Sequence, residues 1–387
     1  MAHEEKPLSF GAVVEQVQAV TPLVVLKSKE GEACVAVSPE LQARILTSSA
    51  TGLAGRSYGW VNLPLIASRQ PLEHFNPYGG EDRIWLGPEG GQYSVFFAPG
   101  TEFDLDHWYV PAPLDTEPFE LVEQSTTHVR LKKLFRQQNH SGTYFDLGLD
   151  RTVRLLKAEA ASQSLTPDLL AGVKAVAFES HNVLINTGTS KWTRDKGLLS
   201  IWNIGQFNAS PSATIVVPIV EGPEEKLGKP INTEYFAPLG EDRLKIMPHV
   251  ACLKADSQYR CKIGVNPRRV TGQLGSYDAE NNVLTLVEHS MASPEAAYVN
   301  AEWRMQDEPY AGDVANCYND GPAPNGSQLG AFYELESSSP AAALEPGGSI
   351  THVHRTFHFE GSTDKLNALA QTLFGLTLKQ IAQALPA

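Results

Sequence analysis

Alternation of apolar and polar residues with a period of two runs through most of the sequence and limits the folds open to it. Residues 173–186 (VKAVAFESHNVLIN) form one such segment, in which Glu179 and His181 fall on one side of the predicted strand and its neighbours on the other. Further strands are expected at residues 93–97, 129–134, 152–156, 214–219, 283–287, 332–336 and 351–359. Because no regular helices separate these segments, the pattern favours antiparallel sheets over a parallel α/β sheet.

Helical periodicity is confined to the two ends of the chain. Residues 9–20 predict one helix, Ser362 or Thr363 is expected to cap a second, and Thr377 to begin a third. The apolar positions that these helices are expected to bury are Phe10, Val13, Val14, Val17, Leu366, Leu369, Leu373, Leu378, Ile381 and Leu385. The 31 glycines and 26 prolines among 387 residues add many turn-forming positions between the predicted strands.

Domain organisation follows from these patterns, because the sequence contains no internal repeat, low-complexity tract or long linker. We therefore expect an all-β protein, a large antiparallel sandwich that forms a single domain over residues 1–387. A lead-in over residues 1–25 and C-terminal helices over residues 361–387 are expected to pack outside the sheets.

The charge balance restricts the partners. Lys and Arg total 31 against 44 Asp and Glu, a formal charge of −13, which argues against nucleic-acid or anionic membrane partners. No apolar run approaches the ~20 residues of a membrane-spanning helix. The opening residues MAHEEKP lack the apolar core of a signal peptide. We expect a soluble protein, either cytoplasmic or, if a leader has been removed, periplasmic.

The four cysteines, Cys34, Cys252, Cys261 and Cys317, are too few and too widely spread for a disulfide framework. Cys252 and Cys261 flank a predicted hairpin and are able to pair, but reduced, half-buried thiols are the expected state. No phosphate-binding loop, dinucleotide fingerprint, Gly-x-Ser-x-Gly motif or zinc-type cysteine pair is present, so we expect no cofactor.

Polar and charged residues are densest at residues 76–91 (NPYGGEDRIWLGPEGG). Two Gly-Gly pairs allow close approach of the backbone, Glu81, Asp82 and Arg83 supply charge, and Trp85 supplies a flat apolar face. A sugar requires this mixture, because its hydroxyl groups form bidentate hydrogen bonds and its C–H faces stack on aromatic rings. A surface turn followed by a core tryptophan is the structural alternative.

Two further segments carry candidate acid–base groups. On the strand at residues 173–186, Glu179 and His181 share one face about 6–7 Å apart at Cα, so the carboxylate is able to orient the imidazole, and Asn182 follows directly. On the strand at residues 332–336, Glu334 and Glu336 share one face, and each discourages ionisation of the other. A core histidine and a solvated outer face, respectively, are the structural alternatives.

The last strand places His352, His354 and His358 on one side and Val353, Phe357 and Phe359 on the other. Two histidines at i and i+2 are able to chelate a metal ion. Since no nearby acidic residue completes the set, a polar strand face accounts for the same pattern and no metal is predicted.

These segments together resemble the galactose mutarotase-like superfamily of aldose 1-epimerases and related sugar-binding proteins. Residues 79–89 (GGEDRIWLGPE) are similar to a Gly-Gly…Trp…Pro-Glu signature of its bacterial branches. The Glu-Leu-Glu at 334–336, the Ser-Pro at 339–340, the Leu-x-Pro-Gly at 344–347 and the final His/Arg strand also match. The likeness runs in order over about residues 40–360.

The resemblance implies a β-supersandwich, two large antiparallel sheets with a sugar site on a concave face. Family members use a His as general acid on the ring oxygen and a Glu as general base on the anomeric hydroxyl, without a cofactor. By position, His181 is then the acid and Glu336 or Glu334 the base. The remaining residues expected to contact the sugar are Glu81, Asp82, Arg83, Trp85, Glu179 and Asn182.

Three functions stay open. The first is an aldose epimerase or mutarotase-like isomerase that uses the His/Glu pair on a small sugar or oligosaccharide. The second is a non-catalytic carbohydrate-binding module that uses the same cleft. The third is a sugar hydrolase or lyase in which Glu334 and Glu336 are the working pair.

Overall fold

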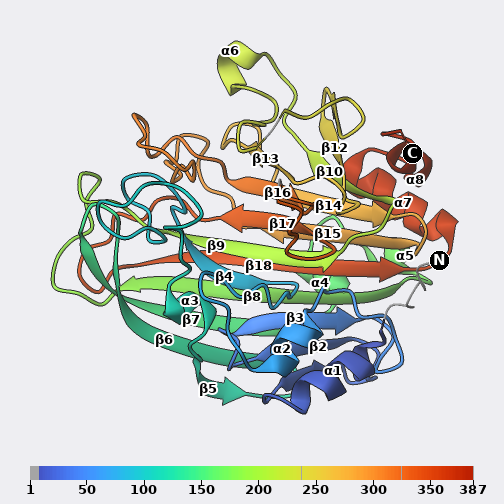
Figure 1. The fold of residues 1–387 in the computed structure, drawn as a ribbon. Coiled ribbons are helices and arrows are strands. Elements are labelled where there is room, and N and C mark those ends of the chain that lie inside the picture. Colours follow the sequence, from blue (N-terminus) through green and yellow to red (C-terminus); the bar gives the residue numbers. More distant parts are fainter. Residues whose placement is uncertain (1–7, 237, 324, 387) are drawn as a thin grey trace.

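The computed structural model describes residues 8–236, 238–323 and 325–386. Its architecture is dominated by antiparallel strands arranged in three sheets (Figure 1). The largest sheet has ten strands, in the order β11 (Leu244–Met247), β12 (Val250–Lys254), β10 (Ala213–Pro218), β14 (Gln273–Asp278), β15 (Val283–His289), β18 (Ser349–Glu360), β8 (Lys174–Asn186), β7 (Tyr144–Leu156), β6 (His128–Gln138) and β5 (Glu120–Gln124).

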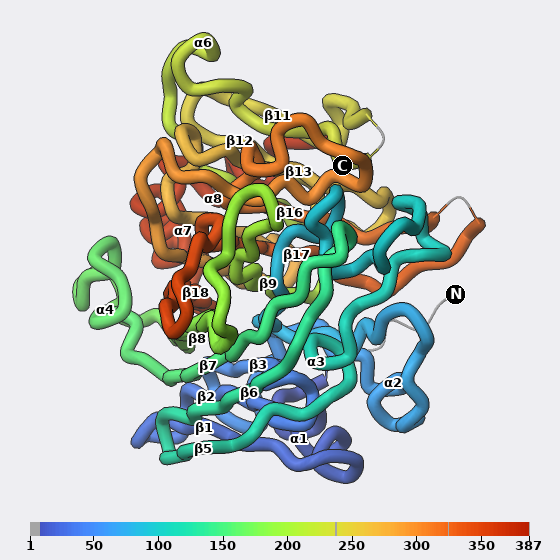
Figure 2. The backbone as a smooth tube through the Cα atoms, turned by 90° about the vertical axis from the view of Figure 1, so that its left-hand side faces the viewer, coloured from blue at the N-terminus to red at the C-terminus, as the bar shows by residue number. Residues whose placement is uncertain are grey.

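The second layer consists of the two smaller sheets. The five-stranded sheet has the order β13 (Cys261–Val265), β16 (Ala315–Asn319), β17 (Phe332–Ser338), β9 (Ser200–Asn208) and β4 (Arg83–Gly87). The three-stranded sheet has the order β1 (Val24–Lys27), β2 (Cys34–Ser38) and β3 (Arg44–Ser49). Figure 2 shows this small sheet beside β5, β6 and β7 at one end of the molecule.

The apolar core lies between the two layers, because each strand turns one row of its alternating side chains inward. One cluster joins Ile215 and Leu253 of the large sheet to Ile263 and Leu335 of the five-stranded sheet. A second joins Phe178 of β8 to residues of β3, β4 and β9. The predicted antiparallel sandwich is therefore confirmed.

Helices cover the outer faces of the layers. α1 (Phe10–Gln18) and α2 (Leu63–Ser68) pack on the three-stranded sheet, whereas α7 (Thr363–Phe374) and α8 (Leu378–Ala382) pack on the large sheet. Ser362 is the N-cap residue of α7, and Thr377 caps α8 through a capping box, as the sequence predicts. Four single-turn helices lie in loops: α3 (Ala112–Asp115), α4 (Ala158–Ala161), α5 (Pro167–Leu170) and α6 (Glu224–Leu227).

One predicted strand is wrong. Residues 93–97 form a turn in which only Phe97 makes a β-bridge, with Trp108. Val95, Phe96 and Phe97 are all buried, so consecutive side chains enter the core instead of alternate ones. The Ser94 hydroxyl, which donates to the carbonyl of Glu89, stabilises this turn.

All four cysteines are buried free thiols. Cys252 belongs to the cluster under α7 and α8, and Cys261 to the core between the sheets, so the two do not pair. None of the helices in the described part of the chain has the length and apolar content needed to cross a lipid bilayer.

Candidate functional site

The outer face of the five-stranded sheet collects buried charge. Strand register places Glu336 between Asn316 and Ile204, and Glu334 between Tyr318 and Gln206. The alternate residues, such as Leu335, point into the core between the sheets. Glu334 and Glu336 therefore share one face, as the sequence predicts. Arg83, Trp85, Trp202, Gln206, Lys262 and Tyr318 extend from neighbouring strands onto the same face.

Glu336 is fully buried, and only one of its two carboxylate oxygens accepts hydrogen bonds. Its Oε2 accepts hydrogen bonds from Nε1 of Trp202 at 2.8 Å and from Nζ of Lys262 at 3.0 Å. Its Oε1 has no hydrogen-bond partner among the described residues. A buried carboxylate oxygen without a partner is costly, so this oxygen is suited to accept a proton or a ligand hydroxyl.

Glu334 lies two residues earlier on β17 and has a different environment. Its Oε1 accepts from Nε2 of Gln206 at 2.8 Å and from Nη2 of Arg83 at 3.3 Å. Burial raises the pKa of the Glu334 carboxyl to about 7, with Arg83 opposing the shift and Glu336 adding to it. A carboxyl with a pKa near neutrality is suited to the role of a general acid or base.

Arg83 links Glu334 to an aromatic cluster. Its Cζ lies 3.9 Å from the centroid of the Trp85 ring, within the range of a cation–π interaction. Trp85 is 3% exposed and donates its indole N–H to the carbonyl of Leu114 at 3.1 Å. Because Arg83 and neighbouring rings cover Trp85, this side chain supports the site from below, and Trp202 is the tryptophan that reaches a pocket.

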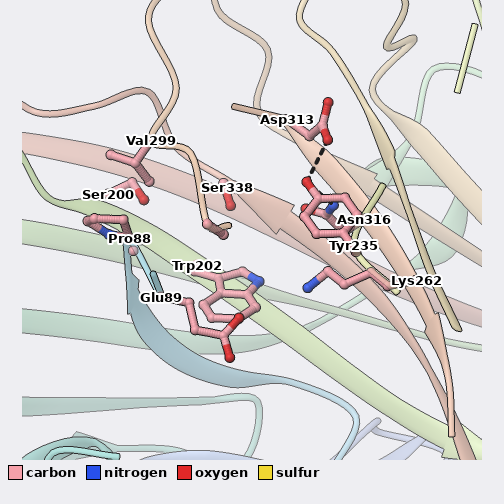
Figure 3. A pocket seen from close by; sticks show the side chains of 12 residues that line it. Pro88, Glu89, Ser200, Trp202, Tyr235, Lys262, Val299, Asp313, Asn316 and Ser338 are labelled. Atoms are coloured by element: carbon pink, nitrogen blue, oxygen red, sulfur yellow. Dashed lines mark hydrogen bonds between the residues drawn. The ribbon is translucent and has the colours of Figure 1, made fainter. Parts of the chain in front are cut away.

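That pocket, called the Trp202 pocket below, is a small hollow of about 20 Å³ beside Trp202 and Lys262. Figure 3 shows Trp202 at its centre, with Lys262 on one side and Glu89 below. The lining residues come from β4, β9, β13, β16, β17 and the loops between them: Gly87, Pro88, Glu89, Ser200, Trp202, Tyr235, Lys262, Val299, Ala301, Asp313, Asn316 and Ser338.

Lys262 supplies the positive charge of this pocket. Burial lowers the pKa of its ammonium group, but the carboxylates of Glu336 and Glu89 more than offset this effect and raise the pKa overall. Its Nζ also lies 4.9 Å from the ring centroid of Trp202. Lys262 is therefore a fixed cation that stabilises negative charge on Glu336.

Three of the sequence-predicted contact residues lie in a polar network between the layers. Asp82 Oδ1 pairs with Nη2 of Arg151 at 3.1 Å, and Arg151 Nη1 donates to Oδ1 of Asn182 at 2.6 Å. Glu81 accepts from the Ser48 hydroxyl at 2.8 Å and lies 2.9 Å from Nε2 of His358. Glu81, Asp82 and Asn182 thus hold the layers together and do not face the Trp202 pocket.

His181 and Glu179 lie elsewhere again, on the outer face of the ten-stranded sheet. Glu179 forms ion pairs with Arg154 at 3.2 Å and with Arg355 at 2.7 Å. His181 borders an open polar depression on β6, β7 and β8, together with Asp150. The two layers separate His181 from Glu334 and Glu336, so the structure does not bring the predicted acid and base together.

His352, His354 and His358 of β18 share one side of the strand, as the sequence predicts, and this side faces the core between the sheets. The Ser337 hydroxyl lies 2.8 Å from Nε2 of His352 and 2.8 Å from Nδ1 of His354. Within residues 8–236, 238–323 and 325–386, no group of three or more His, Cys, Asp or Glu side chains has the arrangement of a metal site.

Sequence reasoning missed Trp202, Gln206, Lys262 and Asp313. Trp202 and Gln206 lie on β9, whose residues 200–208 (SIWNIGQFN) mix apolar and polar side chains on both faces, so alternation gives no signal there. Lys262 and Asp313 also lack a signal, because they reach the site only through pairing of β13, β16 and β17.

Comparison with solved structures supports the resemblance noted from the sequence at the level of the fold. The chain is similar to a candidate aldose 1-epimerase from Escherichia coli K12, with 14% identity, a TM-score of 0.53, and coverage of 88% of this chain and 99% of that chain. It is similar to a galactose mutarotase-like protein from Lactobacillus casei, with 10% identity, a TM-score of 0.51, and coverage of 88% and 100%. The architecture is therefore that of the mutarotase-like β-sandwich.

Comparison of the sequence with curated proteins returned no match. A family of unknown function, DUF6786, matches residues 8–385, which is nearly the whole described chain. The chain belongs to the DUF6786 family.

Proposed function

We propose that this protein binds a small sugar on the outer face of the five-stranded sheet and transfers protons at its anomeric centre, as an aldose epimerase or mutarotase-like isomerase. The observation that carries the proposal is the pair Glu334 and Glu336, buried on one strand face beside Arg83 and Lys262. The mutarotase-like fold adds support for a carbohydrate ligand.

The two carboxyls have environments suited to different roles. Glu334, with a pKa raised to about 7 by burial, is partly protonated at neutral pH and is able to donate its proton to the ring oxygen. Glu336 is held by Trp202 and Lys262 and has an oxygen available to accept the proton of the anomeric hydroxyl. The ring opens to the aldehyde, rotates about its first C–C bond and closes on the other face with the reverse proton transfers. No redox step is required.

His181 has no part in this scheme, because it lies on the far face of the other sheet. We therefore assign to Glu334 the role of general acid, which the family resemblance implied for His181. Arg83 and Gln206 orient Glu334 through the hydrogen bonds to its Oε1.

Sugar binding without turnover is the second candidate. It is favoured by the complete burial of Glu336 and by the two donors that hold its Oε2, since a firmly held carboxylate also serves as a rigid binding group. A hydrolase or lyase is the third candidate and rests on the same two carboxyls.

A nuclear magnetic resonance experiment separates these candidates. Wild-type protein is mixed with freshly dissolved aldoses, and exchange between the α and β anomers is compared with that in the presence of Glu336→Gln and of the surface control Glu345→Gln. We expect accelerated exchange that Glu336→Gln removes and Glu345→Gln retains. Binding without exchange supports the second candidate, and a new reducing end or an unsaturated product supports the third. Absence of binding by every aldose overturns the proposal.

A further inference from the structure

The outer face of the ten-stranded sheet has a depression that the proposed function does not use. This outer-face depression, around Arg130, Thr152, Arg154 and His181, holds about 430 Å³, within the roughly 300–1,000 Å³ typical of small-molecule sites. All its lining residues belong to β5, β6, β7 and β8, and β6, β7 and β8 run side by side in Figure 2. Paired strands of one sheet therefore fix the positions of the groups that face it.

Strand register brings two arginines to this depression. Thr152 of β7 lies opposite Arg130 of β6 on one side and opposite His181 of β8 on the other. Arg154, two residues further along β7, lies opposite Glu179 of β8. Arg130 and Arg154 are therefore diagonal neighbours, about 7–8 Å apart at Cα, with the short side chain of Thr152 beside both.

Arg130 is held in place by a carboxylate that it shares with a second cation. Its Nε donates to Oδ1 of Asp150 at 2.9 Å, and its Nη2 donates to Oδ2 at 2.6 Å. Nζ of Lys132 lies 3.4 Å from the same carboxylate. The Arg130 side chain is 40% exposed, and its Nη1 donates no hydrogen bond to any described residue.

Arg154 repeats this arrangement. Its Nη1 donates to Oε1 of Glu179 at 3.2 Å, and Arg355 of β18 pairs with the same carboxylate at 2.7 Å. The Arg154 side chain is 44% exposed, and its Nε and Nη2 have no hydrogen-bond partner in the described part of the chain. In both groups two cations meet one carboxylate, so each group retains one positive charge.

The remaining carboxylate of the depression lies at its border. Glu123 is on β5, the edge strand of the sheet, and its side chain is 58% exposed. Its Oε1 lies 2.9 Å from Nε2 of His128, which holds this carboxylate beside β6. The free donors of Arg130 and Arg154, on the paired strands β6 and β7, therefore set the chemistry of the depression.

We propose that the outer-face depression binds a small molecule through an oxyanion group, a phosphate or a carboxylate, which Arg130 and Arg154 hold between them. A guanidinium suits this role because its planar fork of N–H groups matches the oxygens of both anions. An anion between the two arginines also offsets their mutual repulsion. The inference goes beyond the proposed function, because Glu334 and Glu336 belong to the other layer of the sandwich.

Titration calorimetry at pH 7 and low salt tests the proposal with inorganic phosphate, glycerol 3-phosphate, acetate and, as the neutral control, glycerol. We expect glycerol 3-phosphate to bind at least about tenfold tighter than glycerol. Arg130→Gln and Arg154→Gln should each weaken this binding about tenfold, the effect of losing one charge-assisted hydrogen bond. Both variants should fold, because Lys132 and Arg355 remain beside the two carboxylates.

Arg136→Gln is the matched control. Arg136 is also on β6 and pairs with Asp146 at 3.5 Å, but it does not line the depression, so its loss should leave the affinity unchanged. Equal weakening by all three variants would reveal a general effect of charge and overturn the inference. Binding that neither Arg130→Gln nor Arg154→Gln weakens, or failure of every anion to bind, also overturns it.

The comparison of acetate with phosphate identifies the oxyanion. Tighter binding of phosphate and its ester supports a phosphate ligand, whereas tighter binding of acetate supports a carboxylate ligand. These results are independent of the proposed function, whose test is anomer exchange and whose residues lie on the five-stranded sheet.

Discussion

Arg151 and Asp82 form an ion pair of 3.1 Å in which neither side chain is exposed to solvent. Arg151 also donates to the carbonyl oxygens of Ala43 at 3.0 Å and Asp82 at 3.1 Å, and to Oδ1 of Asn182 at 2.6 Å. One guanidinium thus joins β7 and β8 of the large sheet to segments of the opposite layer.

Removal of the carboxylate leaves this guanidinium buried without its counter-charge. We expect Asp82→Ala to lower the free energy of unfolding by roughly 3–5 kcal/mol, as for other buried pairs that lose one partner. Urea denaturation followed by circular dichroism measures the change. Glu345→Ala, which removes an exposed pair with Lys191, serves as the control and should have little effect. Equal stability of the two variants would contradict the structural role of Asp82.

Substitution of His181 distinguishes the sequence hypothesis from the structure. Because His181 lies on the outer face of the ten-stranded sheet, we expect His181→Ala to retain sugar affinity and anomer exchange at the wild-type level. Saturation-transfer spectroscopy and exchange rates provide the measurement. Loss of exchange in His181→Ala, with Glu336→Gln still active, would return the acid role to His181.

The raised pKa of Glu334 predicts a pH dependence. Its protonated fraction falls as pH rises through about 7, so an acid at this position loses activity above that pH. Glu334→Gln should lower the rate of anomer exchange roughly 100- to 10,000-fold and remove the decline of activity above pH 7. Exchange rates between pH 5 and 9 provide the test, with circular dichroism to verify folding. An unchanged profile in the variant would exclude Glu334 as the titrating group.

The buried histidines predict loss of stability in acid. Burial lowers the pKa of His289 to about 4 and also lowers the pKa values of His352 and His354. The unfolded chain, with a His pKa of about 6.5, binds more protons between these values, so the contribution of each histidine to stability is present above pH 6.5 and declines as pH falls toward 4.

His289→Gln isolates one share of this effect. Between pH 7 and pH 4, the free energy of unfolding of the wild type should fall by up to about 3 kcal/mol more than that of the variant. Urea unfolding at half-unit pH intervals measures the difference. Parallel curves for the two proteins would show that His289 is protonated equally in both states.

Sequence alone was sufficient for features that depend on neighbouring residues. The side on which each residue lies was predictable for β8, β17 and β18, because a strand turns successive side chains to opposite faces. The helices α1, α7 and α8, and the residues at which α7 and α8 begin, were predictable for the same local reason. That Glu334 and Glu336 share a face also follows from the alternation.

The layer to which each strand belongs was not predictable. β8 and β17 both carry apolar and polar residues on each face, and only long-range pairing decides that β8 joins the ten-stranded sheet and β17 the five-stranded sheet. This decision separates His181 from Glu336. It also places Asp82 and Asn182 in the core, where they connect the two layers through Arg151. Their polar side chains had suggested contact with a ligand.

The sequence by itself therefore determined the class of fold, the faces of the strands and the carboxyl pair Glu334 and Glu336. The tertiary structure alone decided which charged rows face the core and which face the Trp202 pocket. The physical reason is one of range: alternation and capping act over a few residues, whereas Trp202, Lys262 and Glu336 converge through strand pairs formed between distant parts of the chain.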